Sequence, residues 1–299
     1  MRQQSKPGIA NTACTISFAV LVAAIALSVG SNNSYGKTAG TTISFGIVPQ
    51  QSATRLAQVW VPLLNYLGKR TNITIRFATA KDIPTFEECL AKGAYDVAYM
   101  NPYHYTTFSR TAGYRAFARQ KNKKLKGLIV VRKSDSATNL KDLDGSKIAF
   151  PSPAAFGASV IPRAELQAKG VSFTPVYVRS HDSVYRAVSA GIMRAGGGVG
   201  RTFGNMPPEI RSKLKVIYRT LGYTPHAFAT HPRLAKASAN AIASTLTQLD
   251  RTEPKLLKPL GMKAIQLASD RDWNDIRALG LKKAQTKIIT KSQGKCRSG

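Results

Sequence analysis

The chain has 299 residues, of which 43% are hydrophobic, and its 44 lysines and arginines against 15 acidic residues give a formal net charge of +29. This length and composition exclude a solenoid, a low-complexity chain and a small scaffold that depends on disulfides. The basic residues are scattered, with concentrations only at residues 121–126 and 282–297, and no zinc-finger, RRM or basic-helix pattern accompanies them. The charge therefore favours small anions or an anionic membrane surface over nucleic acid as the partner, with a solvated basic surface as the alternative.

The amino terminus has the pattern of an export signal. Basic residues precede a mostly apolar run at residues 13–29, and small and polar residues follow it. We expect residues 1–36 to form a signal peptide that is cleaved between Ala26 and Gly40. An uncleaved anchor stays open, because the run is near the lower limit of ~17 residues for a spanning helix. In both cases the folded part is expected in the periplasm, and the membrane is reached only through the leader or a partner.

The first folded segments are expected to alternate between strands and helices. Residues 42–48 have the pattern of a strand, and a helix to about residue 69 follows. A second strand is expected at residues 73–78, and the next helix carries Cys89. This alternation is typical of a parallel α/β lobe.

The most informative segment is residues 90–105, LAKGAYDVAYMNPYHY. A helical pattern stops at Gly93, alternating apolar residues form a short buried strand, and the strand opens directly into an Asn-Pro pair. Ligands bind at this rim of an open α/β sheet. We therefore expect Tyr99, Asn101 and Tyr103 to contact a ligand, with core packing as the alternative for the two tyrosines.

A weaker copy of this pattern at residues 188–198 indicates a second, similar lobe. The glycine run at residues 196–200 predicts a turn, and it lacks the spacing of a nucleotide-binding loop. Strands of this second lobe are expected at residues 147–150, 174–178 and 215–219.

Polar segments indicate where the chain passes between the lobes. A strand at residues 128–132 is expected to end the first passage through lobe I, and residues 133–139 and 220–226 are the predicted crossings. The predicted organisation is lobe I at residues 42–132 and 224–285, lobe II at residues 133–223, and a basic tail without a fixed position at residues 286–299.

Two cysteines, Cys89 and Cys296, follow the predicted leader. Cys89 lies among apolar helix neighbours, which favours a buried small hydrophobe over a reactive thiol. A disulfide between the two stays open, since pairing requires Cα atoms ~4.4 to 6.8 Å apart. No HExxH, GxSxG or clustered Cys/His set occurs in the sequence, so we expect no metal, no cofactor and no catalytic residue.

Four segments carry a resemblance to a known family: GIVPQQS, the Tyr-Asp-Val-Ala to Asn-Pro stretch, LKDLDGSKIAFPSP and RSHDSVYRAVSAG. Over residues 42–280 the chain resembles the phosphate, phosphite and phosphonate binding proteins of ABC transporters. The resemblance implies a type II periplasmic binding protein, in which two α/β lobes on a hinge of two crossing segments close on a small anion. It implies an ABC transporter permease as the partner. A ligand-sensing module of the same fold for a membrane histidine kinase, with arsenite or another oxyanion as ligand, is the alternative.

The turn PSPAAFGAS is expected to supply one anion-binding helix N-terminus, because the first N–H groups of a helix lack partners within it. In the family this turn usually reads P-x-S-T-S-G, and its hydroxyls grasp the phosphoryl oxygens. Ala155, Phe156 and Gly157 stand at the matching positions. The expected ligand contacts here are therefore backbone N–H groups together with Ser152 and Ser159.

The second expected N-terminus carries His181, Asp182 and Ser183. The resemblance implies that His181 contacts the ligand, and a neutral or protonated imidazole suits an anion. Arg201 stands where aminophosphonate binders place a carboxylate for the ligand's amine, which favours a wholly anionic ligand. The predicted ligand-binding residues are Tyr99, Asn101, Tyr103, Ser152, Ser159, His181, Asp182, Ser183 and Arg201.

Overall fold

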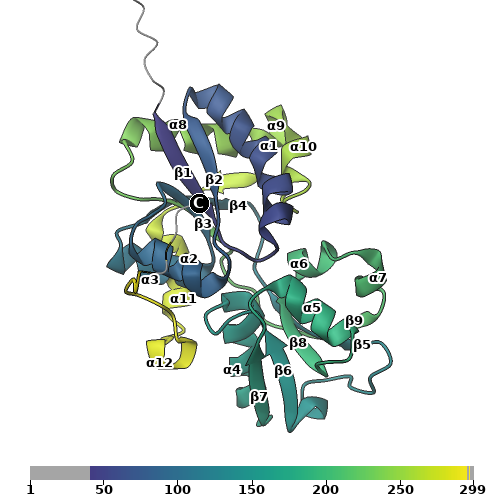
Figure 1. Cartoon of the computed structure of the whole chain (residues 1–299). Coiled ribbons are helices and arrows are strands. Elements are labelled where there is room, and N and C mark those ends of the chain that lie inside the picture. Colours follow the sequence, from purple (N-terminus) through teal and green to yellow (C-terminus); the bar gives the residue numbers. More distant parts are fainter. Residues whose placement is uncertain (1–40, 295, 297–299) are drawn as a thin grey trace, which may run out of the picture. The chain divides into compact units, whose positions relative to one another are not determined.

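The computed structural model describes residues 41–294 and Cys296, so the predicted leader and its cleavage site lie outside the described residues. Two separate mixed β-sheets organise these residues, and each sheet has its own helices (Figure 1). The fold is thus α/β with two lobes, as the sequence predicts. Among the described residues, no helix is long and apolar enough to span a bilayer.

The first sheet contains six strands in the order β11-β4-β10-β3-β1-β2. β1 pairs in parallel with β2 and β3, whereas β10 runs antiparallel between β3 and β4, and β11 runs antiparallel to β4. The strands of this sheet are β1 (Thr42–Ile47), β2 (Thr74–Ala78), β3 (Val97–Met100), β4 (Arg115–Gln120), β10 (Ala227–Thr230) and β11 (Ile265–Leu267).

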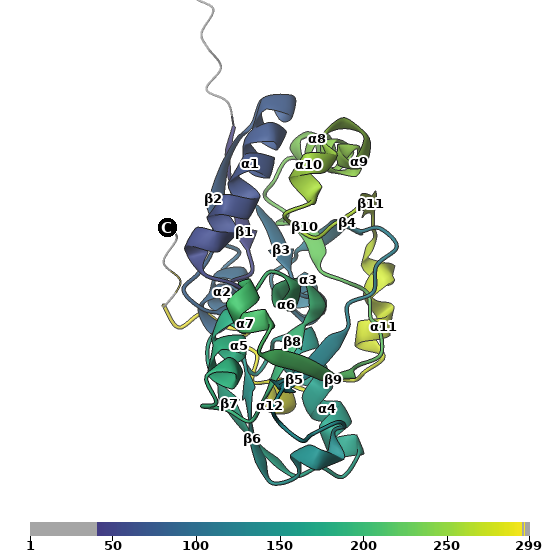
Figure 2. The same ribbon diagram turned by 90° about the vertical axis from the view of Figure 1, so that its right-hand side faces the viewer.

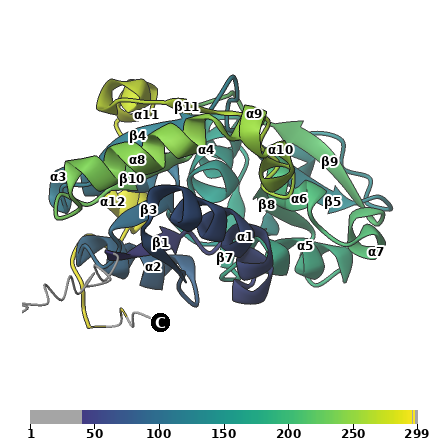
Figure 3. The same cartoon turned by 90° about the horizontal axis from the view of Figure 1, so that it is seen from above.

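Helices cover both faces of this sheet. α1 and α8 pack together above it in the view of Figure 1, whereas α2, α3 and α11 lie below it (Figures 1 and 3). The helices of this lobe are α1 (Ala53–Thr71), α2 (Ile83–Ala91), α3 (Pro102–Thr111), α8 (Lys236–Thr247), α9 (Leu249–Thr252), α10 (Pro254–Leu257), η3 (Asp270–Trp273), α11 (Asn274–Arg277) and α12 (Lys283–Thr286).

The local sequence explains why α1 begins and packs where it does. The side chain of Ser52 caps the helix by accepting a hydrogen bond from the Arg55 N–H. Apolar residues then recur every three or four positions and form one buried face. That buried face consists of Leu56, Val59, Trp60, Leu63, Leu64 and Leu67.

The second sheet repeats the arrangement of the first, with five strands in the order β7-β6-β8-β5-β9. β6 pairs in parallel with β7 and β8, and β5 runs antiparallel to both β8 and β9. Its elements are β5 (Gly127–Arg132), η1 (Lys141–Leu143), β6 (Ser146–Phe150), η2 (Phe156–Val160), α4 (Ile161–Ala168), β7 (Phe173–Tyr177), α5 (His181–Ser189), β8 (Ala195–Val199), α6 (Gly200–Gly204), α7 (Pro208–Arg211) and β9 (Leu214–Arg219).

The position of β5 corrects the predicted boundary of lobe I. Its residues 127–131 are buried, and the strand runs antiparallel between β8 and β9 in the second sheet instead of belonging to the first. The first crossing between the sheets is therefore at residues 121–126, not 133–139. The return crossing is at residues 220–226. The two crossings pair with each other, because Leu125 and Tyr223 exchange backbone hydrogen bonds of 2.7 and 2.9 Å.

The glycine run also differs from its prediction, because it forms the buried strand β8 and not a turn. A Cβ atom on Gly197 would lie 2.1 Å from the carbonyl oxygen of Ala158 in η2. A Cβ atom on Gly198 would lie 2.0 Å from the hydroxyl of Tyr185 in α5. The glycines are therefore required for the close approach of η2 and α5 to the strand.

The C-terminal tail was predicted to have no fixed position, and this prediction is wrong for its described residues. Thr286 is buried, and its hydroxyl lies 2.9 Å from the hydroxyl of Tyr103. Cys296 forms a disulfide with Cys89 on α2, with the two Cα atoms 4.9 Å apart. The segment thus returns to α2 (Figure 2), and the pairing that the sequence left open is formed.

We expect Gly197→Ala to lower the free energy of unfolding by about 1–3 kcal/mol, since the added methyl overpacks the contact between β8 and η2. Gly204→Ala is the matched control, because a Cβ there meets no atom within 4 Å. It should leave stability unchanged or raise it by up to about 1 kcal/mol. Urea unfolding of both variants measures the difference, and equal midpoints would contradict the packing argument.

Candidate functional site

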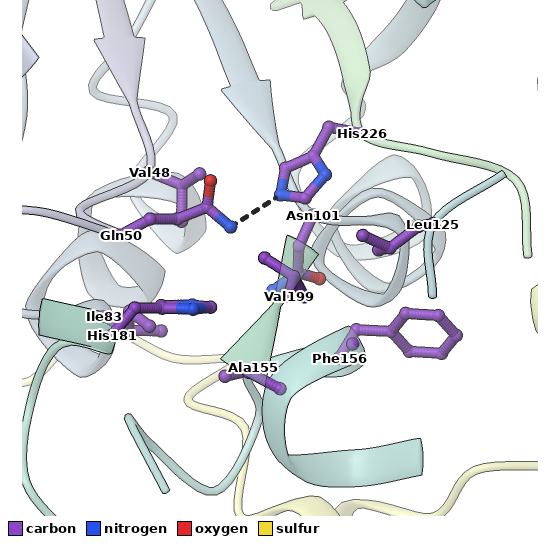
Figure 4. Close-up of a pocket in the computed structure, with 12 residues that line it drawn as sticks. Val48, Gln50, Ile83, Asn101, Leu125, Ala155, Phe156, His181, Val199 and His226 are labelled. Carbon is purple, nitrogen blue, oxygen red and sulfur yellow. Dashed lines mark hydrogen bonds between the residues drawn. The ribbon is translucent and has the colours of Figure 1, made fainter. Parts of the chain in front are cut away.

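A small pocket lies where the beginnings of several helices meet between the two sheets. Its wall contains the first residues or caps of α2, α3, η2, α5 and α6. Its polar side chains are Gln50, Asn101, His181 and His226, and Figure 4 shows Gln50 and His226 reaching toward one another across it. Among the described residues, none that lines this pocket carries a carboxylate. Helix N-termini present N–H groups and positive potential, so the pocket suits an anion.

Hydrogen bonds to backbone carbonyl oxygens connect the lobes at the edge of the pocket. Asn101 caps α3 by accepting from the His104 N–H, and its amide nitrogen donates to the Ala154 carbonyl oxygen across the gap, 3.2 Å away. The His181 N–H donates to the Gln50 carbonyl oxygen at 3.2 Å. The pocket is therefore assembled from both sheets and would change shape if the lobes separated.

The two histidines of the pocket are buried and neutral. Burial, and then the charge of Arg201, lower the pKa of His181 to about 3. The same two causes hold the pKa of His226 well below its ordinary value. The amide nitrogen of Gln50 lies 3.2 Å from His226 Nε2. Because an amide NH₂ only donates, His226 Nε2 accepts this bond and its proton is on Nδ1.

The Nδ1 atom of His181 lies 3.2 Å from the hydroxyl of Thr202. This contact occupies one ring nitrogen and turns the other, Nε2, away from Thr202. In Figure 4 the ring of His181 points toward the centre of the pocket. When the Thr202 hydroxyl donates to Nδ1, the proton of the neutral ring is on Nε2, which can then donate a hydrogen bond to an oxyanion in the pocket.

Arg201 extends from α6 across the gap to the first lobe. Its guanidinium donates to the side-chain oxygen of Gln50 and, at 3.4 Å, to the hydroxyl of Tyr99. It also lies over the ring of Tyr99, 5.5 Å from the centroid. Burial raises the pKa of Tyr99, so its hydroxyl keeps its proton. Arg201 therefore adds a full positive charge at the rim of a pocket otherwise lined by neutral groups.

The structure brings together some of the residues that the sequence singled out. Asn101 and His181 line the pocket. Tyr99 and Arg201 line the adjoining space, where the ring of Tyr99 also stacks on His226 at 5.0 Å.

Five other predicted ligand residues do not line the pocket. The hydroxyl of Tyr103 contacts Thr286, because α3 turns this side chain toward the C-terminal segment. Ser159 accepts from the Arg163 guanidinium at 3.1 Å, and Ser152 is buried outside the pocket wall. Asp182 and Ser183 follow the first residue of α5 and line a separate surface depression.

Gln50 and His226 were not among the predicted site residues. Gln50 stands in GIVPQQS, in the loop that follows β1, so its place near the carboxyl end of a parallel strand was a usable signal. His226 ends the return crossing, and only the pairing of the following strand β10 with β3 and β4 in the first sheet brings it to the pocket.

The two lobes, their paired crossings and the pocket between them define a type II periplasmic binding protein. The family model described as "ABC transporter, phosphonate, periplasmic substrate-binding protein" matches residues 45–273. The chain belongs to this family, whose members are transport proteins rather than enzymes.

Individual relatives are distant. The phosphate-import protein PhnD of Mycolicibacterium smegmatis is 23% identical over 183 residues, 52% of this chain and 54% of the relative. The chain thus spans about half the length of this curated relative. A binding protein component of an ABC phosphonate transporter from Pseudomonas aeruginosa has a TM-score of 0.76 at 18% identity, with 85% of this chain and 90% of that chain covered. PhnD1 from Prochlorococcus marinus, in complex with methylphosphonate, has a TM-score of 0.73 at 17% identity, with coverage of 80% and 97%. Both structures share the fold.

Two further features bear on the chemistry. Within the described part of the chain, no group of three or more His, Cys, Asp and Glu side chains could hold a metal ion. Cys89 is joined to Cys296, so the structure offers no free thiol at Cys89 for the arsenite hypothesis.

The neutral state of His181 predicts how stability depends on pH. The pKa of His181 is about 3 in the folded protein and 6.5 in its ordinary state. Above pH 6.5 His181 is neutral in both states and does not change the free energy of unfolding. Between pH 6.5 and about pH 3 the unfolded chain binds a proton at His181 that the folded protein does not bind. The free energy of unfolding therefore falls by about 1.4 kcal/mol for each pH unit in this range.

His181→Gln should remove this proton uptake, so the free energy of unfolding should fall less steeply with pH than in the wild type. Urea unfolding at a series of pH values below 6.5 measures the two slopes. His231→Gln, at a partly exposed position outside the pocket, should flatten the slope less. Identical slopes for the wild type and His181→Gln would show that His181 protonates in the folded state.

Proposed function

We propose that this protein is the substrate-binding protein of an ABC importer and that its pocket binds a small oxyanion of the phosphate, phosphite and phosphonate class. The observation that carries the proposal is the meeting of several helix N-termini at a pocket whose described lining contains no carboxylate. Membership of the phosphonate-binding family supports it. So do the relatives, one described as a phosphate importer and another as a complex with methylphosphonate.

Different groups around the pocket supply the hydrogen-bond donors and the positive charge that an anion needs. Backbone N–H groups at the start of η2 replace the hydroxyls that family members usually have, since Ala155 and Phe156 cannot donate from their side chains. His181 adds a neutral donor, and Arg201 adds the charge. Closure of the lobes about the paired crossings would bury the anion, and reopening would release it unchanged to the permease.

Arg201 also gives the proposed site a preference among phosphonates. The resemblance to aminophosphonate binders implies that Arg201 stands at a position where those proteins offer a carboxylate to the ligand's ammonium group. Two like charges ~4 Å apart at an effective dielectric constant of ~20 repel by about 4 kcal/mol. This exceeds the ~1 kcal/mol of one neutral hydrogen bond. The proposed ligand is therefore wholly anionic.

A ligand panel tests the proposal directly. We expect phosphate, phosphite or methylphosphonate to raise the thermal midpoint, since a ligand at 100 times its Kd adds about 2.7 kcal/mol of stability. Sulfate, arsenate and arsenite complete the panel, and a response to arsenite alone would favour the sensor hypothesis. Titration calorimetry should show that His181→Ala weakens binding at least tenfold, or ~1.4 kcal/mol. His231→Ala, outside the pocket, should keep the wild-type Kd, and an unchanged Kd in His181→Ala would remove His181 from the site.

The charge preference has its own measurement. In competition calorimetry, 2-aminoethylphosphonate should bind at least tenfold more weakly than propylphosphonate, which has nearly the same size and no ammonium group. Arg201→Glu should narrow this ratio, whereas Arg251→Glu, at an exposed position on α9, should preserve it. Equal affinities of the wild type for the two ligands would contradict the role of Arg201.

A further inference from the structure

A second and larger cavity adjoins the anion pocket. Its volume is about 630 Å³, and it shares Leu125, Val199 and His226 with the wall of the small pocket. Cavities of 300–1,000 Å³ are typical of small-molecule sites. The shared residues make the two spaces neighbours, so one ligand can occupy both.

The walls of this cavity are strongly basic. Lys123, Lys124 and Lys126 come from the first crossing, Arg201 from α6 and Arg219 from the end of β9. None of the described residues that line the cavity is acidic. The sequence alone gives no role to the cluster of basic residues at 121–126. In the structure, lysines of this cluster line the cavity.

One nearby carboxylate reduces this charge only in part. Asp275 Oδ2 lies 3.7 Å from Lys124 Nζ, where both side chains are partly exposed. The same oxygen already accepts the N–H and the hydroxyl of Thr224. The other four cations have no ion pair among the described contacts. Cations gathered in one concave space repel each other, and a bound anion offsets that repulsion.

The basic residues also lie beside the segments that connect the two lobes. Lys123, Lys124 and Lys126 flank Leu125, the residue through which the first crossing pairs with Tyr223 of the return crossing. Arg201 stands at the junction of the two spaces, because it contacts Gln50 of the small pocket and also lines the large cavity. An anion in the cavity would therefore contact both crossings and both lobes.

We propose that the natural ligand carries a second anionic group, which binds in this basic cavity while its phosphoryl group occupies the small pocket. The ligand class is a phosphonate or phosphate monoester with a carboxylate or a second phosphoryl group on a short chain. This inference rests on the proposed function, since it takes the small pocket as the phosphoryl site. The apolar walls at Leu125, Val199 and Pro225 would contact the connecting chain.

Titration calorimetry with phosphonates of graded length tests the inference. The probes are phosphonoacetate, 3-phosphonopropionate and 4-phosphonobutyrate, each paired with the alkylphosphonate of similar length that lacks the carboxylate. At least one carboxylate compound should bind tenfold or more tightly than its alkyl partner, and the ratio should fall as salt screens the cavity.

Matched variants locate the effect. Lys126→Gln/Arg219→Gln should lower the ratio severalfold, because both side chains line the cavity and supply part of its positive charge. Lys147→Gln/Lys213→Gln removes the same charge from exposed positions of the second lobe that do not line it, and it should preserve the ratio.

The outcomes separate this inference from the proposed function. If methylphosphonate binds but every ratio stays near one, the second anionic site is wrong and the proposed function stands. A ratio that is the same in Lys126→Gln/Arg219→Gln as in Lys147→Gln/Lys213→Gln also overturns the inference, because a carboxylate bound in the cavity must respond to the loss of two cations from its wall. If neither phosphate nor any phosphonate binds, the proposed function fails and the inference fails with it.

Discussion

The parallel pairing of three strands along one side of each sheet is the constraint on which the site depends. β1 pairs in parallel with β2 and β3, and β6 pairs in parallel with β7 and β8. A helix that follows a parallel strand begins at the carboxyl edge of the sheet. The positive ends of these helices therefore gather at one edge of each sheet. When the two edges face each other, the N–H groups at the beginnings of α3, η2 and α5 meet around one small volume.

The crossings decide that these two edges face each other. After the chain leaves β4, it enters the second sheet through β5, and on its return it enters the first sheet through β10. Each entering strand is antiparallel and lies beside the parallel core, so both crossings run past the pocket. The mutual hydrogen bonds of Leu125 and Tyr223 make the crossings a two-stranded connection. This pairing keeps the two crossings side by side where the chain passes between the lobes.

Charge is distributed unevenly across the site. His181 and His226 are neutral, because burial makes the charged imidazole costly and Arg201 adds to that cost. The helix N-termini hold only partial charges. The full charges are Arg201 at the rim and, beyond it, the lysines of the first crossing and Arg219 of β9. Desolvation is thus limited to groups that are inexpensive to bury, while the strongly hydrated cations stay at accessible positions.

The sequence by itself determined the elements that depend on local patterns. Hydrophobic periodicity, caps and glycines predict α1, β3 and the N-terminus of α5, and they place Asn101 and His181 at strand and helix ends where ligands bind. The α/β class with two lobes follows from the same alternation. These features depend on residues within a few positions of each other, so the order of residue types is sufficient to indicate them.

Only the tertiary structure decided the features that depend on distant segments. Three such features each require a partner far away in the sequence. They are the pairing of β5 in the second sheet, the formation of a strand by the glycines of β8, and the disulfide between Cys89 and Cys296. A buried apolar strand can pair in either sheet, and a glycine run can be a turn until a neighbour needs the space of its missing side chains. His226 likewise reaches the pocket through the pairing of β10 with β3. Long-range packing resolves such alternatives, because local propensities differ too little to do so.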